Sequence, residues 1–147
     1  MIEESIIVPM NPKGSYSGGS TPGSILAQKW FADREGKVII SFDKLCKYVD
    51  SSEKPRLGFF RDTYESKVTH RFSIIDIVDD KGIAKYLNAP VSPWNKKFLP
   101  PWRRELFEEA CREPKKRTWM LISNIFELNE YKELDYFGKK PSQSFVY

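Results

Sequence analysis

The chain has 147 residues, of which 40% are hydrophobic and 30% are charged, and its formal net charge is +4. This composition is that of a soluble globular protein, and we expect one domain spanning residues 1–147, either as a whole protein or as part of a longer one. No apolar run is long enough to cross a membrane, and the first residues lack the basic start of a secretory signal. A cytoplasmic location is therefore expected. Cys46 and Cys111 have no CxxC spacing and should be reduced thiols, buried rather than reactive.

Runs of β-branched and aromatic residues predict five or six short strands. The clearest pair is residues 56–60 and 68–78, which are joined by a polar turn and should form a hairpin. Further strands are predicted at residues 4–9, 37–42, 118–123 with 125–128 after a possible bulge, and 144–147.

Capping residues and apolar spacing predict one helix early and one late in the chain. The first should begin after Ser24 as N-cap and run through about Asp33, with Gly36 ending it, and the second should span residues 103–112. Shorter helical segments are expected at 43–49 and 82–87, whereas the proline-rich residues 88–102 cannot form a regular element. Together these elements predict an α+β fold, with a small, mostly antiparallel curved sheet or β-barrel flanked by helices.

A glycine-rich segment, residues 14–24, precedes the first predicted helix. A nucleotide-binding loop of the GxxxxGK[ST] type needs a lysine directly after its last glycine, but Gly23 is followed by Ser24 and Ile25. Nucleotide hydrolysis is therefore not expected. The segment is either a plain connector or a binder of one phosphate through backbone N–H groups.

Catalytic residues are difficult to assemble from this sequence. His70 is the single histidine, which excludes a multi-histidine metal site, and it lies in an alternating strand with Thr69 and Arg71 on the opposite face. A hydrogen-bonded core or pocket residue is the more frequent role for such a histidine than a general base. A pair between His70 and Cys111 is disfavoured but stays open.

Acidic residues near the predicted hairpin form a second candidate for chemistry. Asp76, Asp79 and Asp80, with Glu65, could hold the metal of a nuclease, although charged strand ends are the simpler account. We expect neither a metal nor a cofactor.

Aromatic and basic residues give the stronger functional signal. Trp30 lies at the end of the first predicted helix, and Trp94 and Trp102 lie in the proline-rich loop among basic residues. Aromatic faces among cations suit bases that stack while phosphates meet the charges. The predicted backbone-binding cations are Lys96, Lys97, Arg103, Arg104, Lys115, Lys116, Arg117, Lys139 and Lys140. The structural alternatives to nucleic-acid binding are that the tryptophans pack a long loop onto the sheet and that the cations form an ordinary solvated surface.

The order of elements resembles the PUA-like superfamily, and within it the EVE and YTH-type domains that read modified bases. The resemblance rests on a first strand, then "SILAQKWFADREGKV" with Trp30, the hairpin "RLGFFRDTYESKVTHRFSIIDIV", the loop "SPWNKKFLPPW", and the late "MLISNIFELNEYKELDYFG" with the basic "KKPSQS". It implies a binding domain without catalysis, of a kind attached to or encoded beside restriction or RNA-processing enzymes. The glycine-rich first loop and the extra "DKLCKYVD" depart from the family pattern.

Three functions follow from these observations. The first is a reader of DNA or RNA that stacks a modified, flipped or unpaired base between Trp30 and either Trp94 or Trp102. The predicted base-binding residues are Trp30, Trp94, Trp102, Tyr16, Asn11, Ser17 and Ser20. The second is a small nuclease or hydrolase that uses His70. The third is a protein-interaction module, such as an inhibitor from a phage or defence system.

Overall fold

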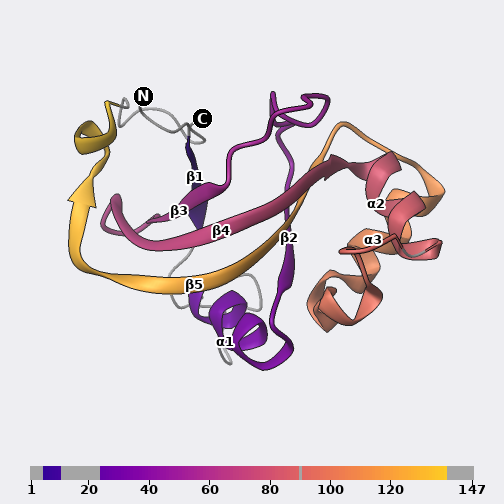
Figure 1. Cartoon of the computed structure of the whole chain (residues 1–147), viewed down its shortest axis with the longest axis horizontal. Coiled ribbons are helices and arrows are strands. Elements are labelled where there is room, and N and C mark those ends of the chain that lie inside the picture. The colour runs from indigo at the N-terminus through magenta and orange to yellow at the C-terminus, as the bar shows by residue number, and fades with distance from the viewer. Residues whose placement is uncertain (1–4, 11–23, 90, 139–147) are drawn as a thin grey trace.

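The computed structural model describes residues 5–10, 24–89 and 91–138. Within these residues, five strands form one mixed, strongly curved sheet in the order β1-β3-β4-β5-β2, with three α-helices around it (Figure 1). This confirms the predicted α+β class with a curved sheet, and the sheet does not close into a barrel. The strands are β1 (Ser5–Met10), β2 (Val38–Phe42), β3 (Leu57–Asp62), β4 (Lys67–Asp79) and β5 (Thr118–Glu133). The helices are α1 (Ile25–Glu35), α2 (Asp80–Asn88) and α3 (Arg104–Arg112), with short 3₁₀ turns η1 (Lys96–Phe98), η2 (Pro101–Arg103) and η3 (Leu134–Phe137).

The curvature of the sheet comes mainly from its two longest strands. β4 pairs with β5 in antiparallel register, and that register shifts at three places along the pair. Two of the shifts add one residue on one strand, and the shift between Val68 and His70 adds three residues on β5. Extra residues of this kind bend the strand that carries them, as bulges do in antiparallel sheets. One residue of β5, Asn124, has a positive φ of 54°, close to the predicted bulge. The hairpin predicted from residues 56–78 is confirmed by the antiparallel pairing of β3 with β4, whereas β1 runs parallel to β3.

Helix α1 has the predicted N-cap and terminating glycine, and it runs two residues beyond the predicted Asp33, to Glu35. The Ser24 hydroxyl accepts a hydrogen bond from the Ala27 N–H at 3.1 Å, which satisfies one of the free donors of the first turn. Gly36 follows the helix with φ of 92°, in the left-handed region that favours glycine, and its N–H donates to the Ala32 carbonyl at 2.8 Å.

Two local predictions were wrong: residues 43–49 form bends and a turn rather than helix, and the proline-rich segment contains η1 and η2. The strand predicted at 118–128 with a possible bulge is confirmed as β5, which runs five residues further, to residue 133. Prolines at the start of a 3₁₀ turn are compatible with it because the missing N–H has no partner to lose there. The strand predicted at 144–147 is outside the described residues.

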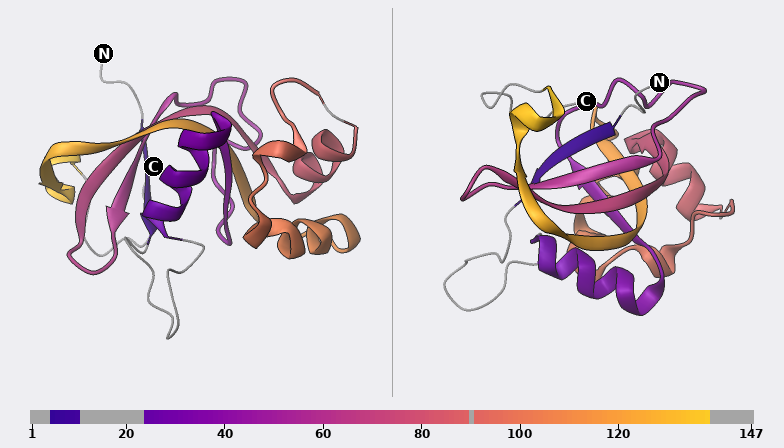
Figure 2. Two further views of the ribbon diagram at one scale, coloured as in Figure 1. Left: turned by 90° about the horizontal axis from the view of Figure 1, so that it is seen from below. Right: turned by 60° about the vertical axis from the view of Figure 1, so that its left-hand side comes forward.

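The apolar core of the described residues consists of three clusters. One cluster joins α1 to the sheet through residues such as Ile25, Phe31 and Ile122, and another joins α2 and α3 to it through Ile83, Phe107 and others. Helices α2 and α3 pack together where β4 ends and β5 begins, which we call the helical end (Figures 1 and 2). The β3–β4 turn and the last third of β5 lie at the opposite end, the hairpin end.

Candidate functional sites

The three tryptophans proposed as cage walls have different environments. Trp30 is 55% exposed on α1, and the guanidinium of Arg34 lies 4.6 Å from the centroid of its ring. Trp94 is only 2% exposed and its indole N–H donates to Asp76 Oδ2 at 2.8 Å. Trp102 is half-buried and meets Phe31 edge-on, with centroids 5.8 Å apart. Trp94 therefore offers no open face, which corrects its assignment as a wall, and Trp102 serves mainly to pack η2 against α1.

Two of the predicted phosphate-binding cations are buried. The Arg103 guanidinium donates to Gln28 Oε1 at 2.5 Å, and burial lowers the pKa of Arg103 to about 9. Arg117 Nη2 lies 3.3 Å from Asp80 and 3.5 Å from Glu109. The assignment of both residues as backbone-binding cations is corrected, because a buried guanidinium with a protein partner cannot contact the phosphates of a nucleic acid at the surface.

The other predicted site residues are exposed or undescribed. The exposed cations are Lys96, Lys97, Arg104, Lys115 and Lys116, of which Lys115 pairs with Glu109 at 3.0 Å. Asn11, Tyr16, Ser17, Ser20, Lys139 and Lys140 lie outside the described residues.

The acidic residues considered for a nuclease metal have structural partners. Asp79 accepts from the Gly82 N–H at 2.9 Å as N-cap of α2, and the buried Asp80 accepts from the Trp119 indole at 2.7 Å. In the described part of the chain, no three histidine, cysteine or acidic side chains come close enough to hold a metal ion. Charged strand ends, the simpler interpretation, account for them.

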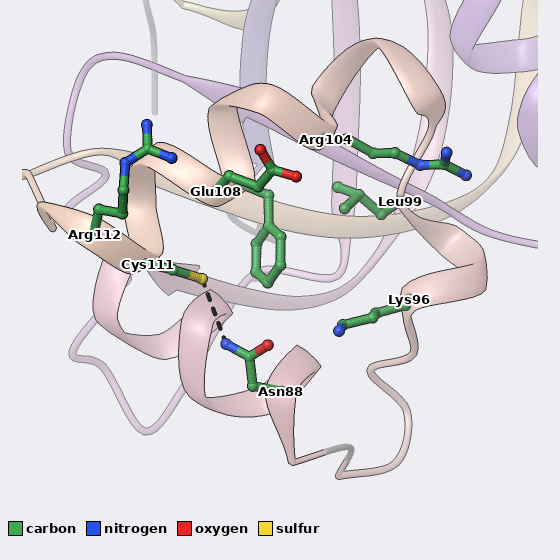
Figure 3. Close-up of a pocket in the computed structure, with 8 residues that line it drawn as sticks. Asn88, Lys96, Leu99, Arg104, Glu108, Cys111 and Arg112 are labelled. Atoms are coloured by element: carbon green, nitrogen blue, oxygen red, sulfur yellow. Dashed lines mark hydrogen bonds between the residues drawn. The ribbon is translucent and has the colours of Figure 1, made fainter.

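A pocket of about 630 Å³ opens at the helical end, between α2, α3 and η1 (Figure 3). We call it the α2–α3 pocket; it is lined by Asn88, Lys96, Leu99, Arg104, Phe107, Glu108, Cys111 and Arg112. The Lys96 side chain points across it, whereas the Arg104 and Arg112 guanidinium groups are directed toward its margins. Three cations against one carboxylate favour an anionic group at this mouth.

The two cysteines differ in exposure. Cys46 is buried, as expected, and burial raises the pKa of its thiol. Cys111 is exposed at the α2–α3 pocket, where its Sγ accepts from Asn88 Nδ2 at 3.4 Å, which corrects the expectation that both thiols are buried. His70 lies in a different pocket, so Cys111 and His70 do not form a catalytic pair.

A second pocket, of about 470 Å³, lies at the hairpin end between α1, the β3–β4 turn and β5. We call it the His70 pocket; it is lined by Leu26, Asp62, Tyr64, Glu65, Thr69, His70, Glu127 and Tyr131. Three of these residues are carboxylates and none is a lysine or arginine. Tyr64 and Tyr131 are both exposed, so aromatic rings border the pocket.

His70 is held as a neutral base in this pocket. Its side chain is 7% exposed, and burial lowers the pKa of the imidazole despite the nearby Glu127 carboxylate. Nδ1 lies 2.7 Å from Thr69 Oγ1, whereas Nε2 has no hydrogen-bond partner among the described residues. A neutral imidazole with one free nitrogen can donate or accept, depending on its tautomer.

The sequence missed most of this pocket because strand alternation fails there. The register of β4 against β5 shifts between Val68 and His70, and Thr69 and His70 both line the pocket instead of facing opposite ways. Asp62, Thr69, Glu127 and Tyr131 were not predicted as site residues. The polar turn after residue 60 was the one local signal for them.

The exposed stripe of α1 begins at the His70 pocket and leads toward η1. Leu26, Trp30 and Arg34 are spaced by four residues, so they lie on one face of the helix. Leu26 lines the His70 pocket. Beyond the helix, the Lys37 ammonium lies 4.9 Å from the Phe98 ring centroid, next to Lys96 and Lys97 of η1. We call Leu26, Trp30, Arg34 and Lys37 the α1 track.

Comparison with known proteins gives no relative from which a function could be transferred: no family model, curated protein or solved structure matches the chain. Within the described residues, none of the helices has the length and apolar character needed to span a membrane.

Proposed function

We propose that this protein binds single-stranded nucleic acid. An unpaired base occupies the His70 pocket, and the nucleotides that follow it lie along α1 toward the exposed lysines of η1. The observation that carries the proposal is the α1 track. An exposed indole and a guanidinium over it lie on one face of α1, and a further lysine follows just after the helix ends.

The track has the chemistry of a single-strand binding surface. Base–aromatic stacking contributes about 1–3 kcal/mol per base, and lysine and arginine along the same path neutralise phosphates. The 11 residues of α1 extend for about 16 Å, enough to separate a base in one pocket from phosphates near the other. A Trp30 face, rather than a Trp94 or Trp102 face, is then the stacking platform.

The resemblance to PUA-like readers belongs to the same proposal. It supports a binding domain, with a partner enzyme or effector, that acts on DNA or RNA in the cytoplasm. The revised base site uses tyrosines and polar groups of the hairpin end in place of the tryptophan pair.

Replacement of Trp30 tests the proposal. Trp30→Ala should weaken binding of a fluorescent single-stranded oligonucleotide about tenfold at fixed salt, because one stacked base loses its platform. Phe126→Ala is the matched control, since Phe126 is also an exposed aromatic under a guanidinium, with Arg71 5.9 Å from its centroid, but it lines neither pocket. Equal binding by wild type and a folded Trp30→Ala protein would contradict the proposal.

The environment of His70 supports a hydrolase as the second candidate function. A buried neutral imidazole with a free Nε2, in a pocket with three carboxylates, could accept a proton from water. His70→Gln should then abolish turnover of an oligonucleotide substrate. Unchanged turnover in that variant, or none in the wild type, contradicts this second candidate.

A further inference from the structure

We infer that the His70 pocket selects a base that presents adjacent hydrogen-bond donors, as guanine does, over one that presents mainly acceptors, such as uracil or thymine. This inference rests on the proposed function and names the class of base that the site takes. It is carried by the lining of the pocket and by the hydrogen bonds already formed within it.

The charges of the pocket exclude phosphate from it. Asp62, Glu65 and Glu127 line it without a lysine or arginine among the lining residues. Anionic groups are repelled by such a site, whereas N–H donors and cationic ring systems are attracted. The base must therefore enter while its phosphate stays outside, toward the α1 track.

Free acceptors remain after the internal hydrogen bonds are counted. Asp62 is 8% exposed, and its Oδ1 accepts from the Tyr64 N–H at 2.6 Å and from the Glu65 N–H at 3.2 Å. Glu127 Oε1 accepts from the Tyr131 hydroxyl. In the described residues the second oxygen of each carboxylate has no hydrogen-bond partner. An ionised carboxylate can only accept hydrogen bonds, so the free oxygen of Asp62 and that of Glu127 both favour hydrogen-bond donors on the ligand.

The donor pattern of a base decides between candidates. Guanine carries an N1–H and an exocyclic N2–H on adjacent positions of one edge, and these two donors suit the free carboxylate oxygens that line the pocket. Uracil and thymine carry one N–H between two carbonyls, which would bring their oxygens against the carboxylates. A correct bidentate pair is worth about 1–3 kcal/mol of discrimination between bases.

The remaining groups suit a flat ring in this position. Tyr64 and Tyr131 border the pocket and can stack on a base. The unpartnered Nε2 of the almost fully buried His70 can meet either a donor or an acceptor on the ring, because a neutral imidazole exists in two tautomers.

Nucleosides test the inference because they carry no phosphate. Guanosine and uridine are titrated separately into the ¹⁵N-labelled protein, and backbone amide shifts are followed. We expect guanosine to bind about tenfold more tightly than uridine and to shift the amides of residues 62–70 and 127–131. Glu127→Gln should lose most of this preference. Glu133→Gln, which removes the same charge on an exposed part of β5 outside the pocket, should retain it.

Two outcomes overturn the inference, and they differ from failure of the proposed function. Equal affinity for guanosine and uridine, or guanosine shifts that avoid the pocket amides, removes the base preference. If oligonucleotides still bind through Trp30 in that case, the proposed function stands and only the base class is wrong. If guanosine binds in the pocket but oligonucleotides do not bind, the pocket is a small-molecule site and the proposed function fails.

Discussion

At the scale of single residues, two tryptophans of the proline-rich loop differ in one hydrogen bond. The Trp94 indole N–H is satisfied by Asp76, whereas the buried indole nitrogen of Trp102 has no partner in the part of the chain that the structure describes. A hydrogen bond to a charged group contributes about 1.5–3 kcal/mol, and an unsatisfied buried donor costs about 1–3 kcal/mol.

This difference predicts opposite results for the same substitution. Trp94→Phe should lower the free energy of unfolding by about 1.5–3 kcal/mol, because Asp76 loses a donor. Trp102→Phe should be neutral or stabilising, since it keeps an edge-on contact with Phe31 and removes the unsatisfied N–H. Urea unfolding of both variants measures this, and a larger loss in Trp102→Phe than in Trp94→Phe would contradict this account of the two indole N–H groups.

The pH dependence of stability gives a second prediction at this scale. Burial lowers the pKa of His70 below its ordinary value of 6.5, with Lys29 acting in the same direction and Glu127 and Asp62 opposing it. Below pH 6.5 the unfolded chain therefore binds a proton that the folded chain resists, and stability falls as the pH falls. His70→Gln should reduce the loss of stability between pH 7.5 and pH 5.5, measured by urea unfolding at each pH. An unchanged loss would mean that other groups cause it.

Residue roles were harder to predict than residue types. Arg103 donates a hydrogen bond to Gln28, which lies 75 positions away in the sequence, and Trp119 donates one to Asp80, 39 positions away. Nothing local distinguishes these side chains from surface cations and exposed aromatics, because their burial depends on elements brought together only by the fold. Ser24 and Gly36 were predictable because capping depends on the nearest four residues.

At the scale of elements, Asp80 ties the start of α2 to β5. It is fully buried and accepts from the Trp119 indole at 2.7 Å and the Lys115 N–H at 2.9 Å, while Arg117 lies 3.3 Å away. One carboxylate thus satisfies a buried indole, a loop N–H and a buried guanidinium. The hairpin was predictable from the alternation of apolar and polar residues in its strands. The hydrogen bonds of Asp80 and the register shift that places both Thr69 and His70 at the pocket were not.

Removal of this carboxylate should be costly. Asp80→Asn should lower the free energy of unfolding by about 3–5 kcal/mol, because it leaves Arg117 buried with a weaker partner. Asp33→Asn is the matched control: Asp33 lies 2.7 Å from Lys29, but its side chain is 56% exposed, so the change should cost less than about 1 kcal/mol. Thermal or urea unfolding separates the two, and equal effects would contradict a structural role specific to Asp80.

At the scale of the whole molecule, opposite kinds of charge lie at opposite ends of the sheet. The His70 pocket at the hairpin end has three carboxylates, whereas the α2–α3 pocket at the helical end has three cations. A net charge of +4 does not reveal this separation, since it averages the two ends. Under the proposed function the two ends would have different tasks: discrimination between bases at one end and attraction of phosphates at the other.

The salt dependence of oligonucleotide binding tests that division. Lys96→Gln with Lys97→Gln should reduce the slope of log K against log salt by about one per lysine, because each phosphate contact releases counterions. Preference for guanine over uracil in the oligonucleotide should be unchanged, since neither lysine lines the His70 pocket. The control, Lys67→Gln with Lys132→Gln, removes the same charge at the hairpin end and should leave the slope nearly unchanged. If both pairs reduce the slope equally, attraction of phosphates does not depend on the helical end. If neither does, the exposed lysines of η1 are solvated surface, and no nucleic acid binds between α1 and the helical end.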